Sequence, residues 1–133
     1  MYSCSFRLIN ISRIFFGAEL NGLFSAQVVP NDEIVSREEG KKIFAYECDG
    51  FGNYLLQDDA NIPSLLSLPY LGVCAESDSI YLNTRSFVLS GKNPYFYQGR
   101  VLTGLGSQHT PVNQIWPLGI AMQGITSSSA EEI

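Results

Sequence analysis

The segment from Ile115 to Ile125 restricts most strongly the folds that are open to this chain. Its residues are apolar at nearly every position, so a helix in this segment has no polar face to turn toward water. A helix that is apolar on all sides is buried on all sides in a globular protein. The chain has 133 residues, which suits one domain and leaves little other material to surround such a helix. The sequence therefore predicts a part of a larger helical structure.

The last residues give a second indication of the same kind. Ser128 and Ser129 precede Glu131 and Glu132 by three residues, which is the spacing of a capping box at the start of a helix. The sequence ends at Ile133, before one helical turn is complete. We therefore expect the chain to be a piece of a longer protein.

Composition excludes several classes of function. The chain has 8 Lys plus Arg against 13 Asp plus Glu, a net charge of −5, which gives no positive field for nucleic acid. Its hydrophobic content of 45% is too high for a disordered acidic tail. The 3 cysteines are too sparse for a disulfide framework. Apolar runs stay below the roughly 18 residues that cross a bilayer, so we expect no membrane segment, and the compartment stays open.

The first part of the chain predicts one helix and one hairpin. Apolar residues at helical spacing favour a helix near residues 6–20. A hairpin is predicted within residues 41–57, where a glycine-containing turn separates an aromatic run at 43–46 from a return strand at 54–56.

Two helices are predicted next. The first begins at Asn61 as N-cap, with Pro63 in its first turn, and Pro69 shortens or kinks it. The second covers about residues 77–89, with Asp78 at its positive N-terminal end.

The remainder of the chain predicts a strand, a loop and the apolar helix already described. Residues 95–97 form an aromatic, strand-like run, and residues 104–109 form a glycine-rich loop that contains the only histidine. The predicted fold class is therefore mainly α with a short β-hairpin.

Six segments together resemble glycoside hydrolase family 125. They are Ala45 to Tyr54, Asp58 to Gly72, Tyr81 to Arg85, Asn93 to Tyr97, Gly104 to Pro111, and Ile115 to Pro117. The resemblance implies a partial catalytic domain over residues 41–133 and leaves residues 1–40 as a poorly matched N-terminal segment. It also implies that the chain is a fragment of an (α/α)6 barrel. The family's proteins are exo-acting α-1,6-mannosidases, which hydrolyse terminal α-1,6-linked mannose with inversion.

The catalytic residues that the resemblance implies are not found in this sequence. Inversion needs a general acid and a general base, two carboxyl groups separated by the attacking water. The family has the acid upstream and the base downstream of the matched part, so no catalytic residue is assigned and the chain alone is expected to be inactive. The alternatives are a non-catalytic carbohydrate-binding or structural remnant of such a barrel, and another (α/α)6 glycosidase that acts on an α-glucan.

Four residues are candidates for binding a mannose-containing oligosaccharide: Asp58, Asp59, Asn61 and His109. Carboxylates accept strong hydrogen bonds from sugar hydroxyls, but neighbouring side chains point in different directions, so at most one of Asp58 and Asp59 is expected to face a ligand. Helix capping is their alternative role, and a surface or structural position is the alternative for His109. A lone histidine without a cysteine pair gives no metal site, and no cofactor is expected.

Overall fold

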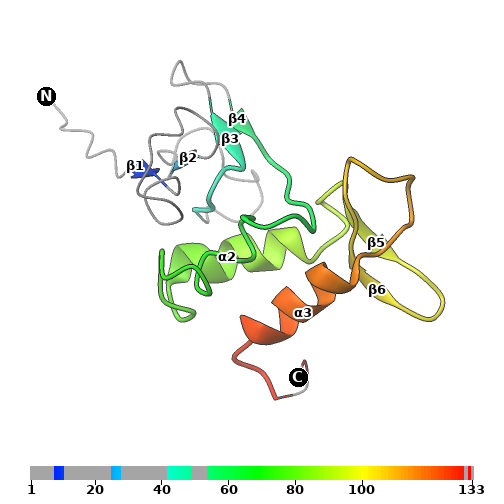
Figure 1. Ribbon diagram of the computed structural model, residues 1–133. Helices are drawn as coiled ribbons and strands as arrows, with labels where there is room; N and C mark the ends of the chain where they lie inside the picture. Colours follow the sequence, from blue (N-terminus) through cyan, green and yellow to red (C-terminus); the bar gives the residue numbers. More distant parts are fainter. Residues whose placement is uncertain (1–7, 11–24, 28–41, 49–53, 131, 133) are drawn as a thin grey trace, which may run out of the picture.

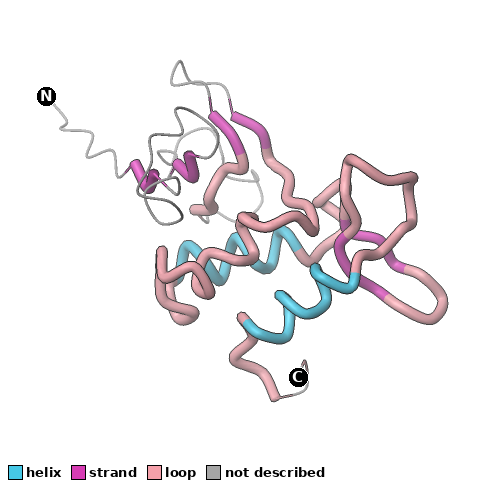
Figure 2. Tube along the Cα trace, in the orientation of Figure 1, coloured by secondary structure: helices cyan, strands magenta, loops and turns pink. Residues whose placement is uncertain are grey.

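The computed structural model describes residues 8–10, 25–27, 42–48, 54–130 and 132. These residues contain two helices and six short strands, and the strands pair two by two as antiparallel ladders (Figure 1). Long loops and turns join these elements (Figure 2). Helices combined with a small antiparallel hairpin agree with the predicted elements of a fragment.

The first strand lies inside a stretch that the sequence predicts as helix. Strand β1 (Leu8–Asn10) pairs with β2 (Ser25–Gln27), with Leu8 opposite Gln27. The predicted helix at 6–20 is therefore wrong at residues 8–10, and its other residues lie outside the described part of the chain. The backbone groups of residues 8–10 form their hydrogen bonds with β2, a strand distant in the sequence, and not within a helix. The local apolar pattern could not show this pairing.

The predicted hairpin within residues 41–57 is confirmed, with shorter strands. Strand β3 (Glu47–Cys48) pairs with β4 (Tyr54–Leu55). The aromatic run 43–46 lies before β3 and not within it. Phe44 in this run is buried, and its backbone N–H donates to Thr84 Oγ1 at 2.8 Å. This run is therefore attached to the next helix along the chain.

The helix predicted near residues 77–89 is confirmed as α2 (Ser79–Val88). Asp78 is its N-cap, and Asp78 Oδ1 accepts from the N–H groups of Ile80 at 2.8 Å and Tyr81 at 3.1 Å. These bonds satisfy two of the amide groups that a helix start leaves unpaired. The buried stripe of α2 consists of Tyr81, Thr84 and Val88.

The helix predicted to begin at Asn61 is wrong. Residues 64–72 form a series of turns instead. Ser67 Oγ accepts from Ser64 N–H and donates to Ser64 O, both at 2.8 Å. Such side-chain bonds compete with helical backbone pairing, and Pro69 has no N–H with which to continue it.

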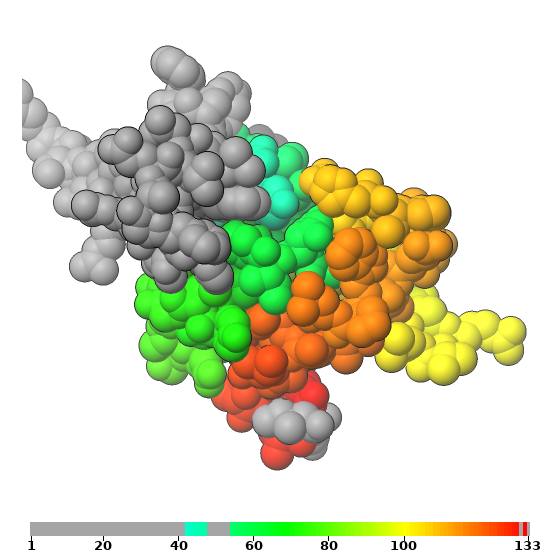
Figure 3. Space-filling view, in the orientation of Figure 1, coloured from blue at the N-terminus to red at the C-terminus, as the bar shows by residue number. Residues whose placement is uncertain are grey.

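A second hairpin follows α2. Strand β5 (Phe96–Gln98) confirms the predicted aromatic strand and pairs with β6 (Thr103–Leu105). The loop predicted at 104–109 is therefore strand at its first two residues. The connection between β5 and β6 projects from the body of the molecule (Figure 3), and Val101 at its tip is 98% exposed.

The apolar helix is confirmed as α3 (Pro117–Ile125), but it is not buried on all sides. Its buried residues are Gly119 and Met122, whereas Leu118 is 44% and Ile125 is 56% exposed. A Cβ on Gly119 would lie within 3.2 Å of Ala60 Cβ. The helix therefore approaches Ala60 closely at Gly119, while Leu118 and Ile125 lie on an exposed face.

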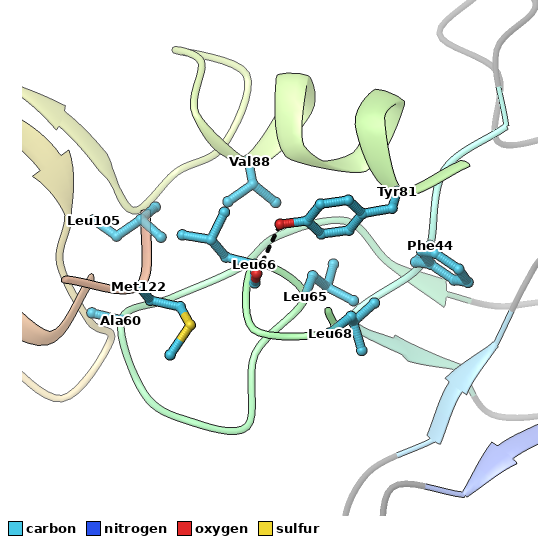
Figure 4. Close-up of a cluster of buried hydrophobic side chains, with 9 residues drawn as sticks. All are labelled: Phe44, Ala60, Leu65, Leu66, Leu68, Tyr81, Val88, Leu105 and Met122. Atoms are coloured by element: carbon cyan, nitrogen blue, oxygen red, sulfur yellow. Dashed lines mark hydrogen bonds between the residues drawn. The ribbon is translucent and has the colours of Figure 1, made fainter. Parts of the chain in front are cut away.

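One apolar core joins these elements (Figure 4). Residues 64–72, here called the turn segment, contribute side chains to this core, as do the two helices and β6. The buried stripe of α2 alone is too narrow to form a core. Tyr81 O–H donates to Leu66 O at 3.0 Å, which satisfies a buried phenol within this core. The core consists of Phe44, Ala60, Leu65, Leu66, Leu68, Tyr81, Val88, Leu105 and Met122.

Candidate functional site

The segment 58–61 lies against the loop that follows β6. Ala60 N–H donates to Gly106 O at 2.8 Å. Residue 106 has to be glycine here, because a Cβ would clash with Gln114 O and with the ring of Tyr97. This close approach brings two polar segments, far apart in the sequence, side by side.

A buried polar group, here called the Asp59 cluster, joins the two segments through Asp59, Asn61 and Ser107. Asp59 Oδ2 accepts from Ser107 Oγ at 2.9 Å and from Asn61 Nδ2 at 2.8 Å. Asp59 Oδ1 accepts from Asn61 N–H at 3.0 Å. Asn61 Nδ2 also donates to Ser107 Oγ at 3.0 Å. Since Asp59 is only 1% exposed, these bonds compensate for burying its carboxylate.

The neighbouring Asp58 faces in another direction and binds the turn segment. Its Oδ1 accepts from Leu65 N–H and its Oδ2 from Leu66 N–H, each at 2.9 Å. Asp58 is 0% exposed, and this burial raises its pKa to about 7, although the two amide hydrogen bonds act to lower it. The structure therefore places the Asp58 carboxylate on the backbone of the turns, where no helix is present to be capped, and the predicted N-cap function of Asn61 is wrong.

Asn93 holds this pair of acids in position from the other side. Its Nδ2 donates to Asp58 O and to Val88 O, both at 2.9 Å, and its Oδ1 accepts from Asp58 N–H at 3.2 Å. The buried Asn93 therefore connects the end of α2 with the segment that contains the acids. The sequence around Asn93 gave no sign of this bond, which spans 35 residues.

Tyr46 lies close to the two carboxylates. Burial, followed by the charges of Asp59 and Asp58, raises the pKa of the half-buried Tyr46 to about 12. The phenol therefore stays protonated at neutral pH, and Tyr46 packs against the apolar core. Trp116 donates through Nε1 to Thr110 Oγ1 at 3.1 Å.

His109 lies in the exposed part of the site. Its backbone N–H donates to Ser107 Oγ at 3.2 Å, which attaches it to the Asp59 cluster, while the residue itself is exposed. Thr110 N–H donates to Ser107 O at 3.2 Å, so residues 107–110 form a tight turn.

The described residues contain no group of three His, Cys, Asp or Glu side chains that could hold a metal ion. In the same part of the chain, neither helix reaches the length and apolarity required to cross a bilayer.

Three of the four residues predicted to bind sugar therefore gather around one serine. Asp59 and Asn61 bind Ser107 through side chains and His109 through its backbone, whereas Asp58 faces the turn segment. Their contact with a sugar stays a prediction. Sequence reasoning missed Ser107, because the only signal was its place in the glycine-rich loop, and its acid partner is 48 residues away.

Comparisons with known proteins agree on one family. Residues 25–133 match the family model described as "Metal-independent alpha-mannosidase (GH125)". The "Meiotically up-regulated gene 157 protein" of Schizosaccharomyces pombe is 46% identical over 101 residues, which cover 75% of this chain and 20% of that protein.

A solved structure gives the same result. It is a metal-independent α-mannosidase of Streptococcus pneumoniae in a non-productive complex with α-1,6-mannobiose, 50% identical, with a TM-score of 0.68 over 70% of this chain and 22% of that chain. The chain thus spans about a fifth of the length of both proteins, 20% and 22%. The extent of the family match and both similarities show that this chain belongs to the metal-independent α-mannosidases of family GH125.

Proposed function

We propose that this chain forms part of the mannose-binding pocket of an inverting exo-α-1,6-mannosidase with an (α/α)6 barrel. The family membership and the α-1,6-mannobiose bound by the streptococcal relative support the substrate class. The observation that argues most for a pocket in this chain is the Asp59 cluster, which connects segments 48 residues apart through buried polar groups.

The Asp59 cluster has the chemistry that a sugar pocket requires. Sugar hydroxyls both donate and accept hydrogen bonds, so a pocket needs polar side chains that are held still before the ligand arrives. The buried Asp59 and Ser107 hold the partly exposed Asn61 and the exposed His109 in place. The ring of Tyr46 adds an apolar surface of the kind on which a sugar ring packs.

Hydrolysis requires more than these residues supply. An inverting glycosidase places its acid and base about 6.5–9.5 Å apart, on opposite sides of the bond that breaks. Asp58 and Asp59 are adjacent and buried, and their oxygens bind Leu65, Leu66, Asn61 and Ser107. Neither is placed to pass a proton to a substrate. We therefore propose that the acid and base belong to parts of the protein outside this chain, and that the chain alone binds without hydrolysing.

Binding and hydrolysis are tested separately on the same chain. Titration with α-1,6-mannobiose is expected to show binding that Asn61→Ala and His109→Ala weaken by about tenfold each, while the exposed hairpin variant Val101→Ala binds as the unmodified chain does. An assay for released mannose is expected to show none. Mannose release at ordinary enzyme rates would refute the proposed inactivity.

Maltose serves as the matched disaccharide control. Equal affinity for maltose and α-1,6-mannobiose would contradict the mannose assignment and favour a glycosidase acting on an α-glucan. If the folded chain binds neither maltose nor α-1,6-mannobiose, the result would favour a structural remnant of the barrel.

A further inference from the structure

The chemistry around Asn61 fixes which end of its side-chain amide faces the protein. Asn61 Nδ2 lies 2.8 Å from Asp59 Oδ2 and 3.0 Å from Ser107 Oγ. A carboxylate can only accept hydrogen bonds, so the edge of the amide that faces Asp59 has to be the NH2 group. The NH2 group is thereby turned toward the protein, and the amide has one orientation.

Ser107 is fully engaged inside the protein. A hydroxyl has one hydrogen to donate and two lone pairs to accept with. Ser107 Oγ donates to Asp59 Oδ2 and accepts from Asn61 Nδ2 and from His109 N–H. It is also 0% exposed, so it has neither access to a ligand nor a free bond for one.

The carbonyl oxygen Oδ1 of Asn61 is the polar atom of this cluster that remains available to a ligand. Asn61 is partly exposed, and within the described residues no donor binds its Oδ1. Its NH2 group donates to the carboxyl group of Asp59, which polarises the amide and makes Oδ1 a stronger acceptor. The oxygen thus stands at the edge of the buried cluster with both lone pairs available.

We infer that Asn61 Oδ1 accepts a hydrogen bond from one hydroxyl of the bound mannose, and that Asp59 and Ser107 are positioning residues that fix this acceptor. The inference rests on the proposed mannose pocket and specifies its selectivity. The recognised hydroxyl has to donate. A sugar that carries hydrogen or fluorine at that carbon has no proton to give, so it loses the bond in either case.

The test uses methyl α-mannopyranoside together with its monodeoxy and monofluoro analogues, titrated into the chain. At one ring position, the deoxy and the fluoro analogue are both expected to bind about tenfold more weakly than the parent. In Asn61→Ala that difference is expected to disappear at this position and to persist at the others. Equal binding of the parent and every fluoro analogue would overturn the inference, as would discrimination that survives in Asn61→Ala.

A second measurement needs no ligand. In nitrogen-edited NMR spectra, the side-chain NH2 of Asn61 is expected to exchange with water at least about tenfold more slowly than that of the exposed Asn113, since an amide proton held by two acceptors must break those bonds first. Ser107→Ala and Asp59→Asn should each remove this protection. Equal exchange of Asn61 and Asn113 in the unmodified chain would overturn the positioning role.

The two measurements separate the inference from the function on which it rests. If no mannoside binds although the Asn61 amide is protected, the proposed pocket is wrong and the acceptor has no mannose to bind. If mannosides bind but the fluoro analogues match the parent, the pocket stands and the role of Asn61 is wrong.

Discussion

The bond between Asp59 and Ser107 gives a quantitative test of how the two polar segments are held together. Ser107→Ala removes the hydroxyl that donates to Asp59 Oδ2 at 2.9 Å and that accepts from Asn61 and His109. A hydrogen bond to a charged group contributes about 1.5–3 kcal/mol to stability. We therefore expect Ser107→Ala to lower the free energy of unfolding by about 2–3 kcal/mol.

A double-mutant cycle isolates the bond from its surroundings. Asp59→Asn keeps the shape of the side chain but turns an NH2 group toward donors, so it should cost a similar amount. In the double variant the shared bond is lost only once. The two effects should therefore fall short of additivity by about 1.5–3 kcal/mol.

Urea unfolding followed by fluorescence measures these free energies, because Trp116 is the single tryptophan and it is partly buried. The matched control pairs Asp59→Asn with Ser127→Ala, since Ser127 binds Glu132 and Ser129 and shares no partner with Asp59. That pair should be additive within about 0.5 kcal/mol. Additivity in the Asp59–Ser107 cycle as well would refute the reasoning that this bond joins the two segments.

Further variants test other parts of the structure. Gly106→Ala places a Cβ against Gln114 O and the Tyr97 ring, so it should lower the free energy of unfolding by more than about 2 kcal/mol in urea, whereas Gly91→Ala meets open space and should change little. Because folding raises the pKa of Asp58 from 3.8 to about 7, its contribution to stability is present below pH 3.8 and is lost as the pH rises through 7; urea titrations should show this loss in the unmodified chain and not in Asp58→Asn. We expect the exposed apolar residues Leu118 and Ile125 of α3 to cause self-association of the chain, so Leu118→Glu should reduce it, as measured by sedimentation.

Local signals in the sequence were sufficient where one residue type acts on its own neighbours. Asp78 stands two and three residues before the amides that it caps, so the start of α2 was predicted closely. The β3–β4 hairpin was predicted for the same reason, since a turn and its flanking strands are contiguous. The apolar character of 115–125 predicted a helix, although within the described chain Gly119 and Met122 are the residues of α3 that are buried.

Prediction failed where the deciding partner is remote or is a side chain. The turns at 64–72 follow from serine hydroxyls and from Asp58, whose carboxylate reaches amides seven and eight residues ahead. A pattern of leucines and a proline cannot show that these amides already have acceptors. Asn61 was misread as an N-cap for a related reason, because its amide binds Ser107 across 46 residues.

The adjacent acids Asp58 and Asp59 show why residue type alone does not assign a role. Consecutive side chains leave the backbone in different directions, and here one enters the turn segment while the other meets the loop after β6. Asp58 binds only backbone amides through its carboxylate, so replacing it should alter the geometry of the turns and lower the stability of the fold. Asp59 binds the side chains of Ser107 and of the partly exposed Asn61, so replacing it should change the orientation of the Asn61 amide and weaken ligand binding. Two adjacent aspartates, both buried, therefore divide between fold and recognition according to their partners, and substitutions at the two positions should separate stability from binding.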